Sequence, residues 1–205
     1  DERTATESLI VLGTASALYD DVEGWPKLRN AFREGQQGFG DTFLDLADQY
    51  TGRSSDGSYM SNELDSGAII DCLDWRDRRT VDQYKADVQE FAAKAPVFGP
   101  YIAFSGMHCQ FFPHPKTQRA PNTLTEIKTA PIIVIGTTRD PATPYIWSRS
   151  LAKIFTGSSL ISLDGDGHTG HGRGSACVDD AVDEYLLTGT LPPADLRCDL
   201  EGVSA

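Results

Sequence analysis

The 205-residue sequence has little basic charge and no long apolar run. Its 18 Lys and Arg residues are outnumbered by 30 Asp and Glu residues, and the formal net charge is −12. Nucleic acid and anionic membrane surfaces are poor partners for such a chain because both repel negative charge. No apolar stretch approaches the roughly 20 residues that a membrane-spanning helix needs. We therefore expect neither a nucleic acid nor a membrane as partner.

The four cysteines lack the Cys-x-x-Cys spacing of a zinc ribbon. They stand at positions 72, 109, 177 and 198. Four cysteines allow three disulfide pairings, and the chain alone does not choose among them. Two disulfides would indicate an oxidising compartment, whereas four buried free thiols would fit a cytosolic protein.

The strongest pattern is a pair of short strands, each followed by a residue with catalytic chemistry. Residues 132–135 form a continuous β-branched run, typical of a strand buried on both faces, and Asp140 follows closely. A second short strand, 159–163, leads through a glycine-rich turn to His168. Ligands of open α/β sheets bind at the carboxyl ends of the strands. The pattern predicts an acid and a histidine at that edge.

This arrangement resembles the last two positions of the α/β-hydrolase triad, whose chain order is Ser, then Asp or Glu, then His. Two segments, Gly-Thr-Thr-Arg-Asp-Pro-Ala-Thr-Pro-Tyr at 136–145 and Gly-Asp-Gly-His-Thr at 165–169, are similar to the actinobacterial tripeptidyl-aminopeptidase-like hydrolases. The resemblance implies that Asp140 is the acid and His168 the base.

The same resemblance extends over most of the chain and is strongest from Cys72 to Cys198. It implies the local disulfide pairing, Cys72 with Cys109 and Cys177 with Cys198. Because disulfides persist in oxidising environments, it also implies a secreted or cell-envelope protein.

A nucleophile is missing from this pattern. No Gly-x-Ser-x-Gly elbow occurs in the sequence. The nearest candidate, Ser105, lacks both flanking glycines of the motif and a preceding strand. The sequence also offers only about two core strands, too few for a sheet covered by helices on both faces. We expect the nucleophilic serine and the remaining strands on an N-terminal hydrolase segment or separate chain, and this chain alone to be inactive.

The fold class predicted is α/β: the C-terminal part of an α/β-hydrolase, with its last sheet strands and helices, preceded by a helical lid. Residues 1–65 are assigned to the lid because 1–50 show three amphipathic helical patterns without a strand. Residues 66–205 are assigned to the core. Their first stretch, 68–74, returns from the lid and is ambiguous between strand and helix.

Four further features are predicted for the core. Thr80 and Gln83 form a capping box at the start of a helix. Residues 97–125 form an irregular connection. Thr143 caps a helix that has Pro144 at its first position. Ser175 caps the last helix, which ends at Gly189. The expected buried residues of the last two helices are Trp147, Leu151, Ile154, Val178, Val182, Tyr185 and Leu186.

Other residues have weaker functional interpretations. Asp164 and Asp166 are alternative acids, but lie too close in sequence to His168. His168 and His171 have H-x-x-H spacing, yet their glycine-rich flanks do not hold two imidazoles on one helix face, so no metal is expected. Asp71 and Asp74 would suit binding of a substrate ammonium group; a plain helix-end or loop carboxylate is the preferred interpretation.

The function expected is a secreted serine hydrolase, an exopeptidase that releases short peptides from free N-termini. Its substrate is a peptide or acyl compound, and no cofactor is implied. An esterase or lipase of the same fold is one alternative. A non-catalytic fragment that serves as a binding or assembly partner is another, because the nucleophile is missing.

Overall fold

The computed structural model describes residues 3–74, 79–113 and 126–200. The chain packs into two compact units. One consists of residues 1–16 with 34–123, and the other of residues 17–33 with 124–205. The predicted division into lid and core at residues 65 and 66 stays a prediction. Within the described residues, no helix is long and apolar enough to cross a membrane.

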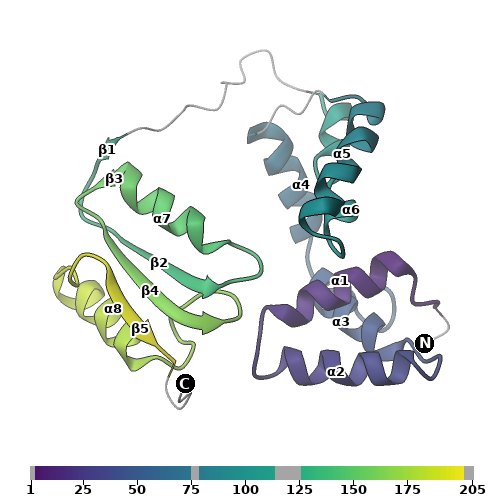
Figure 1. Ribbon diagram of the computed structural model, residues 1–205, viewed down its shortest axis with the longest axis horizontal. Coiled ribbons are helices and arrows are strands. Elements are labelled where there is room, and N and C mark those ends of the chain that lie inside the picture. Colours follow the sequence, from purple (N-terminus) through teal and green to yellow (C-terminus); the bar gives the residue numbers. More distant parts are fainter. Residues whose placement is uncertain (1–2, 75–78, 114–125, 201–205) are drawn as a thin grey trace. The chain divides into compact units, whose positions relative to one another are not determined.

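Three helices occupy the first 51 residues, as predicted: α1 (Glu7–Leu18), α2 (Gly24–Gly35) and α3 (Asp41–Thr51) (Figure 1). Gly13 of α1 allows close packing on α3, because a Cβ atom there would lie 2.6 Å from the carbonyl oxygen of Phe43. The buried residues of α3 are Phe43, Leu44, Leu46 and Ala47. Tyr50, near the end of α3, is 44% exposed.

The first unit also contains the helices α4 (Glu63–Asp74) and α5 (Val81–Lys94). The ambiguous stretch 68–74 is helical, within α4. Helix α5 begins with the predicted capping box. The backbone N–H of Gln83 donates to Thr80 Oγ1 (3.3 Å), and the N–H of Thr80 donates to Gln83 Oε1 (2.7 Å). Because both donors are otherwise unsatisfied at a helix start, this box fixes where α5 begins.

The segment after α5 is more regular than expected. It forms α6 (Gly99–Ile102) and the 3₁₀-helix η1 (Met107–Phe111), so the prediction of an irregular connection is wrong over this part. A disulfide between Cys72 and Cys109 of η1 ties the segment to α4. The rest of the predicted connection, 114–125, lies outside the described residues.

A parallel sheet in the order β2-β4-β5 forms the centre of the second unit. Its strands are β2 (Ile133–Arg139), β4 (Ser159–Asp166) and β5 (Leu196–Asp199). Two shorter strands, β1 (Ile127–Lys128) and β3 (Phe155–Thr156), pair with each other. The α/β class and the two main strands are confirmed. β5 was not predicted, because its sequence, Leu-Arg-Cys-Asp, is short and largely polar.

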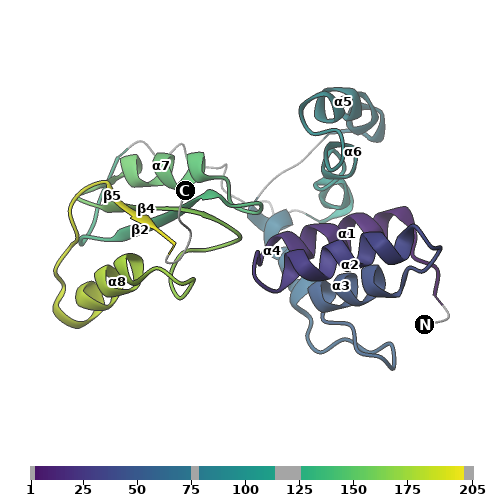
Figure 2. The same ribbon diagram turned by 60° about the horizontal axis from the view of Figure 1, so that its bottom comes forward.

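Helices α7 (Tyr145–Ile154) and α8 (Ala176–Thr188) cover opposite faces of this sheet (Figure 2). The core joins Ile161 and Leu163 of β4 to Val178 of α8 and Cys198 of β5. Gly189 ends α8 in the left-handed conformation, with φ 76°, as predicted. Val182 packs against the core, but Leu186 is 71% exposed and its predicted burial is wrong.

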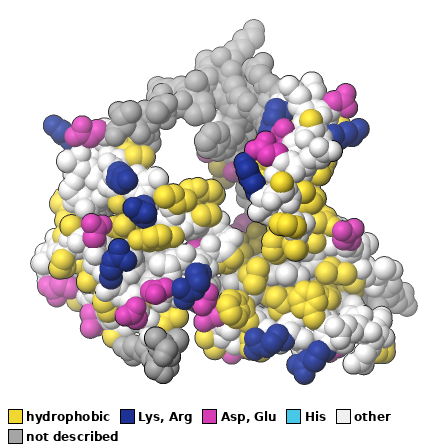
Figure 3. Space-filling view, viewed as in Figure 1, with side chains coloured by type: hydrophobic (Ala, Val, Ile, Leu, Met, Phe, Trp, Pro, Cys, Tyr) yellow, Lys and Arg dark blue, Asp and Glu magenta, His cyan; other side chains and the backbone are white. Residues whose placement is uncertain are grey.

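The apolar stripe of α7 faces away from the sheet. Trp147 is 60% exposed and Leu151 42%, so their predicted burial is wrong. Hydrophobic side chains accordingly gather at the surface over α7 (Figure 3). The helix instead presents Tyr145 and Ser148 to the sheet, where Gly136 leaves room: a Cβ atom at Gly136 would lie 2.7 Å from Ser148 Cβ and 2.8 Å from Tyr145 Cδ2. Because small and polar residues fill this contact, the large apolar ones are left on the surface.

Candidate active site

The carboxyl ends of β2 and β4 bring Asp140 and His168 together. His168 Nδ1 lies 3.0 Å from each carboxylate oxygen of Asp140. The Asp140 side chain is 3% exposed, and that of His168 is 27% exposed. An ionised carboxylate at this place favours the tautomer with the proton on Nδ1. The Nε2 lone pair is then the one that can accept a proton from a substrate or nucleophile.

Four further donors hold the Asp140 carboxylate. Oδ1 accepts from the backbone N–H groups of Ala142 and Thr143, both at 2.8 Å. Oδ2 accepts from Thr143 Oγ1 (2.9 Å) and from the N–H of Thr169 (3.3 Å). Thr143 therefore serves the acid rather than the start of α7, where Pro144 is the N-cap and no side-chain cap forms. The predicted cap role of Thr143 is wrong.

These hydrogen bonds decide the charge of the acid. Burial acts to raise the pKa of Asp140, but the hydrogen bonds that its carboxylate accepts, from the backbone N–H groups of Thr143 and Ala142 above all, outweigh burial and lower the pKa below its ordinary value. A carboxylate that accepts several such bonds stays ionised at neutral pH. Asp140 can therefore orient His168 and stabilise its protonated form.

The loop after β4 is anchored in an unusual conformation. Thr169 has a positive φ of 74°, which is rare for a β-branched residue. Its N–H donates to Asp140, and its carbonyl oxygen accepts from the buried hydroxyl of Thr137 at 2.6 Å. Two hydrogen bonds thus hold a backbone conformation that costs energy by itself, immediately after His168.

The alternative acids have another partner. Arg139 Nη1 lies 2.6 Å from Asp164 Oδ1, and its Nε lies 2.8 Å from Asp166 Oδ1. Hydrogen bonds from Thr138 and Arg139 lower the pKa of Asp164. These contacts clip β2 to β4 where the register shifts between Thr137 and Arg139. The acid that contacts His168 is thus Asp140, and the two other carboxylates fasten the strand ends beside it.

Comparison with known proteins places this geometry in a family. Residues 95–198 match the family model described as "TAP-like protein". The chain belongs to this α/β-hydrolase family. The match spans both strands and both loops that carry Asp140 and His168. The resemblance drawn from segments 136–145 and 165–169 is thereby confirmed.

Several relatives of this chain carry the names of enzymes. The chain is 36% identical over 203 residues to "Serine protease Hip1" of Mycobacterium tuberculosis and 37% identical over 204 residues to "Carboxylesterase B" of the same species. Each match covers 97% of this chain but 38% of the relative. "Tripeptidyl aminopeptidase" of Streptomyces lividans is 35% identical over 97 residues, which are 47% of this chain and 18% of that protein. The chain thus spans well under half the length of these relatives.

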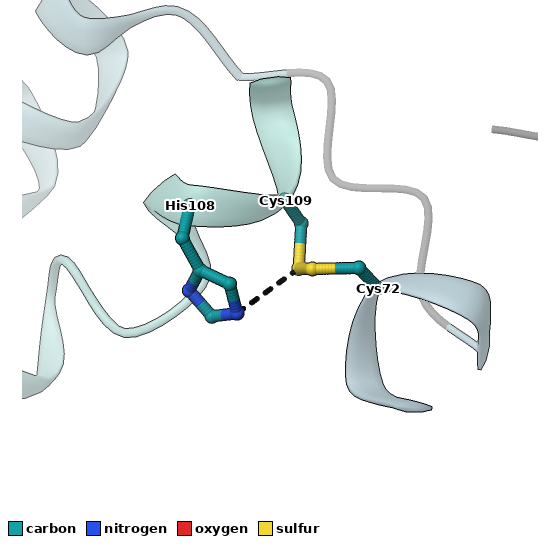
Figure 4. The surroundings of a disulfide bond; sticks show 3 residues. All are labelled: Cys72, His108 and Cys109. Carbon is teal, nitrogen blue, oxygen red and sulfur yellow. Dashed lines mark hydrogen bonds between the residues drawn. A yellow bond between two sulfur atoms is a disulfide. The ribbon is translucent and has the colours of Figure 1, made fainter. Parts of the chain in front are cut away.

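Both disulfides implied by the family resemblance are present. Cys72 pairs with Cys109, and Cys177 with Cys198. His108 Nε2 lies 3.4 Å from Cys109 Sγ, as Figure 4 shows. This trio has the spacing of metal ligands. Because the disulfide leaves neither sulfur as a thiolate, the trio does not fit a metal ion.

The remaining candidate site residues are exposed: Asp71, Asp74 and His171. Asp71 and Asp74 occupy exposed positions in the last turn of α4, in the first unit. Their role toward a substrate ammonium group stays a prediction. His171 Nε2 lies 3.5 Å from Asp183 Oδ1 of α8. Ser175 is the N-cap residue of α8 as predicted, but its side chain makes no cap hydrogen bond.

Two residues of the site were not predicted from the sequence. Thr143 donates hydrogen bonds to Asp140 from its backbone and its side chain, and Thr169 donates one from its backbone N–H. One signal was available for Thr143. Asp followed three residues later by Thr is a common turn pattern in which the Asp side chain accepts from the backbone that follows it. For Thr169 there was none, because its contact depends on the pairing of β2 with β4.

Proposed function

We propose that this chain supplies the acid and the base of a serine hydrolase that releases short peptides from free N-termini. The nucleophilic serine is placed on an N-terminal segment outside these 205 residues. The observation that supports the proposal is the Asp140–His168 pair, in which His168 Nδ1 lies 3.0 Å from both carboxylate oxygens of Asp140. The relatives named serine protease and tripeptidyl aminopeptidase support the reaction class.

In this mechanism the serine hydroxyl attacks the acyl carbon of the substrate. His168 Nε2 takes the hydroxyl proton as the tetrahedral intermediate forms, and then donates it to the departing amine. Water repeats the sequence on the acyl-enzyme, again through His168. Asp140 remains ionised and stabilises the imidazolium through both steps. The oxyanion hole is built around the nucleophile and belongs to the same outside segment.

The second unit offers a surface for that segment. Among the described residues, β2 pairs with β4 alone, so one of its edges is open. Beside β2, helix α7 exposes Ile146 (57%), Trp147 (60%) and Leu151 (42%). An open strand edge next to exposed apolar side chains is suited to receive further strands and helices. We place the N-terminal hydrolase segment there.

The cysteines support our proposal of a secreted or cell-envelope location. Two disulfides account for all four cysteines, and none is free. Such pairs persist in oxidising compartments and are rare in the cytosol.

The test is to produce this chain alone and together with the upstream segment, and to assay both preparations. A fluorophosphonate probe should label the upstream segment, and peptidase activity should appear only in the assembled protein. His168→Ala should remove nearly all turnover of the assembled protein. Turnover by the 205-residue chain alone, stoichiometric with a serine-directed inhibitor, would place the nucleophile within this sequence.

A carboxylesterase is the second candidate, favoured by the match to Carboxylesterase B. Both reactions use the same acid and base, so substrate preference separates them. A higher kcat/KM for short acyl esters than for aminoacyl amides would favour the esterase. No labelling and no turnover in the assembled protein would favour a third role, a non-catalytic binding or assembly module.

A further inference from the structure

The turn between α1 and α2 lies directly against the loop that carries His168. The backbone N–H of His168 donates to the carbonyl oxygen of Tyr19 at 2.8 Å. The two aromatic rings also meet, with centroids 4.8 Å apart and planes at 70°. Tyr19 therefore contacts both the backbone and the ring of the same histidine.

Arg173 fastens this turn to the His168 loop. Its Nη2 lies 3.4 Å from the carbonyl oxygen of Tyr19 and 3.3 Å from Asp21 Oδ1. Its Nη1 lies 3.6 Å from Asp20 Oδ2. The guanidinium thus joins three consecutive residues of the turn from a position five residues after His168.

Asp20 gives the turn a fixed shape of its own. Its Oδ1 accepts from the backbone N–H groups of Val22 (2.9 Å) and Glu23 (3.0 Å), just before α2. The bond from Glu23 lowers the pKa of Asp20 most, against the opposing effect of burial, and the charge of Arg173 lowers it further. Asp20 is therefore an anion at neutral pH, able to pair with Arg173.

The space between turn and loop is tight. Gly167 has a positive φ of 86°. A Cβ atom there would lie 2.8 Å from Arg173 Nη2 and 3.0 Å from the carbonyl oxygen of Tyr19. The residue before the histidine must therefore lack a side chain for the contact to form.

We propose that Tyr19 and Arg173 are positioning residues for His168. Asp140 fixes one nitrogen of the imidazole, and the Tyr19 ring restricts the remaining freedom of the side chain to turn. Arg173 holds Tyr19 in place. The ring then keeps Nε2 aimed at the reacting hydroxyl. This proposal rests on the proposed function of His168 as base.

The first experiment needs no catalysis. The low-field NMR signal of the His168 Nδ1 proton, bonded to Asp140, reports how firmly the ring is held in the 205-residue chain. We expect Arg173→Gln and Tyr19→Leu to broaden or remove this signal. Arg149→Gln is the matched control, since Arg149 is an exposed arginine of α7. Tyr19→Phe keeps the ring and the backbone bond, and should retain the signal. Circular dichroism checks that each variant is folded.

The second experiment measures steady-state kinetics of the protein assembled with its upstream segment. Because small misplacements of a catalytic group cost up to about 10²-fold in rate, Arg173→Gln should lower kcat by about tenfold or more with little change in KM. Arg173→Lys, which keeps the charge, should recover part of the loss.

The outcomes separate the two proposals. If the assembled wild type shows no turnover, the proposed function fails, and the NMR signal still tests the positioning role. If Arg173→Gln and Tyr19→Leu both fold and leave the Nδ1 signal and kcat at wild-type values, the positioning role is overturned.

Discussion

Asp140 shows how a single carboxylate can be buried and yet remain charged. Its side chain is 3% exposed, and it accepts hydrogen bonds from backbone N–H groups, a hydroxyl and His168. The direction of its pKa shift follows from these donors, because they favour the charged form more than burial disfavours it.

Replacing Asp140 with Asn tests its role as the acid of the triad, because the substitution exchanges one carboxylate oxygen for an amide nitrogen. Asp140→Asn keeps the shape of the side chain but can present an amide N–H to His168, which favours the wrong tautomer. We expect kcat of the assembled hydrolase to fall by about 10⁴, as in other triads. Asp180→Asn, at an exposed position of α8, is the control and should keep wild-type kcat. Near-normal turnover of Asp140→Asn would mean that another group orients the base.

The lowered pKa of Asp140 has a consequence for stability. The pKa is lower in the folded chain than in the unfolded chain, where it is about 3.9. The contribution of this carboxylate to the free energy of unfolding is therefore complete above that pH and is lost as the pH falls through the folded pKa. Thermal unfolding of wild type and Asp140→Asn from pH 7 to pH 3 should show a difference in Tm that shrinks on acidification. A constant difference would argue against an ionised, hydrogen-bonded Asp140.

At the scale of elements, β5 is a short strand that a disulfide joins to helix α8. It has four residues and pairs along one edge of β4. Cys198 of β5 is bonded to Cys177 of α8, 21 positions away in sequence. The disulfide restricts the unfolded chain and so stabilises an edge that backbone hydrogen bonds alone would hold weakly.

Removing this bond should therefore loosen the second unit. The double variant Cys177→Ser, Cys198→Ser should lose about 3 kcal/mol of unfolding free energy, the value expected for a loop of this length. Urea titration followed by circular dichroism measures the loss. Reductant also opens the Cys72–Cys109 bond, so the matched comparison is of both proteins under reducing conditions, where wild type and variant should unfold at similar midpoints. An unchanged midpoint in the oxidised variant would contradict the expected stabilisation.

The elements differ in how far the sequence predicts them. β2 and β4 were predicted because their β-branched and aliphatic runs match strands buried on both faces. Asp140 and His168 were predicted because each follows such a run within a known motif. β5 carries no comparable signal. The stripe of α7 was assigned to the wrong face because periodicity shows that a helix has an apolar side but not what lies against it.

The contacts that support the site from distant segments could not be predicted from the sequence. Arg173 and Tyr19 are 154 positions apart, and nothing in either local pattern indicates that they meet. The same holds for the hydrogen bond from Thr137 to Thr169, which depends on how β2 and β4 align. The sequence predicts which catalytic residue types lie at the strand ends. It does not predict the residues that hold them in place, because those contacts arise from tertiary packing.

At the scale of the whole molecule, the exposed apolar side chains of α7 form the surface where we propose that the N-terminal segment docks. Trp147 and Ile146 lie on this helix with more than half of their surface exposed. α7 and α8 lie on opposite faces of the sheet, as Figure 2 shows. Substitutions on α7 and on α8 therefore change opposite faces of the sheet and can be tested separately.

A charge placed on this surface should weaken assembly with the N-terminal segment. Burying a large apolar side chain contributes about 1.5–3 kcal/mol, so Trp147→Glu should raise the Kd by about tenfold or more. Leu187→Glu on α8 is the matched control, because Leu187 is 84% exposed on the other face. Co-purification and titration calorimetry measure the binding. Equal weakening by both variants, or by neither, would place the docking surface elsewhere.

The bond between Cys177 and Cys198 also determines what a cut in the chain can do. The residues between them include the end of α8 at Gly189 and the two prolines at 192 and 193. A protease that cleaved this stretch would leave both products in one molecule, with Cys198 and its strand still fastened to α8. Fragments would separate only after the disulfide was reduced as well. In an oxidising environment, a single cleavage in this stretch would therefore leave the two fragments covalently joined.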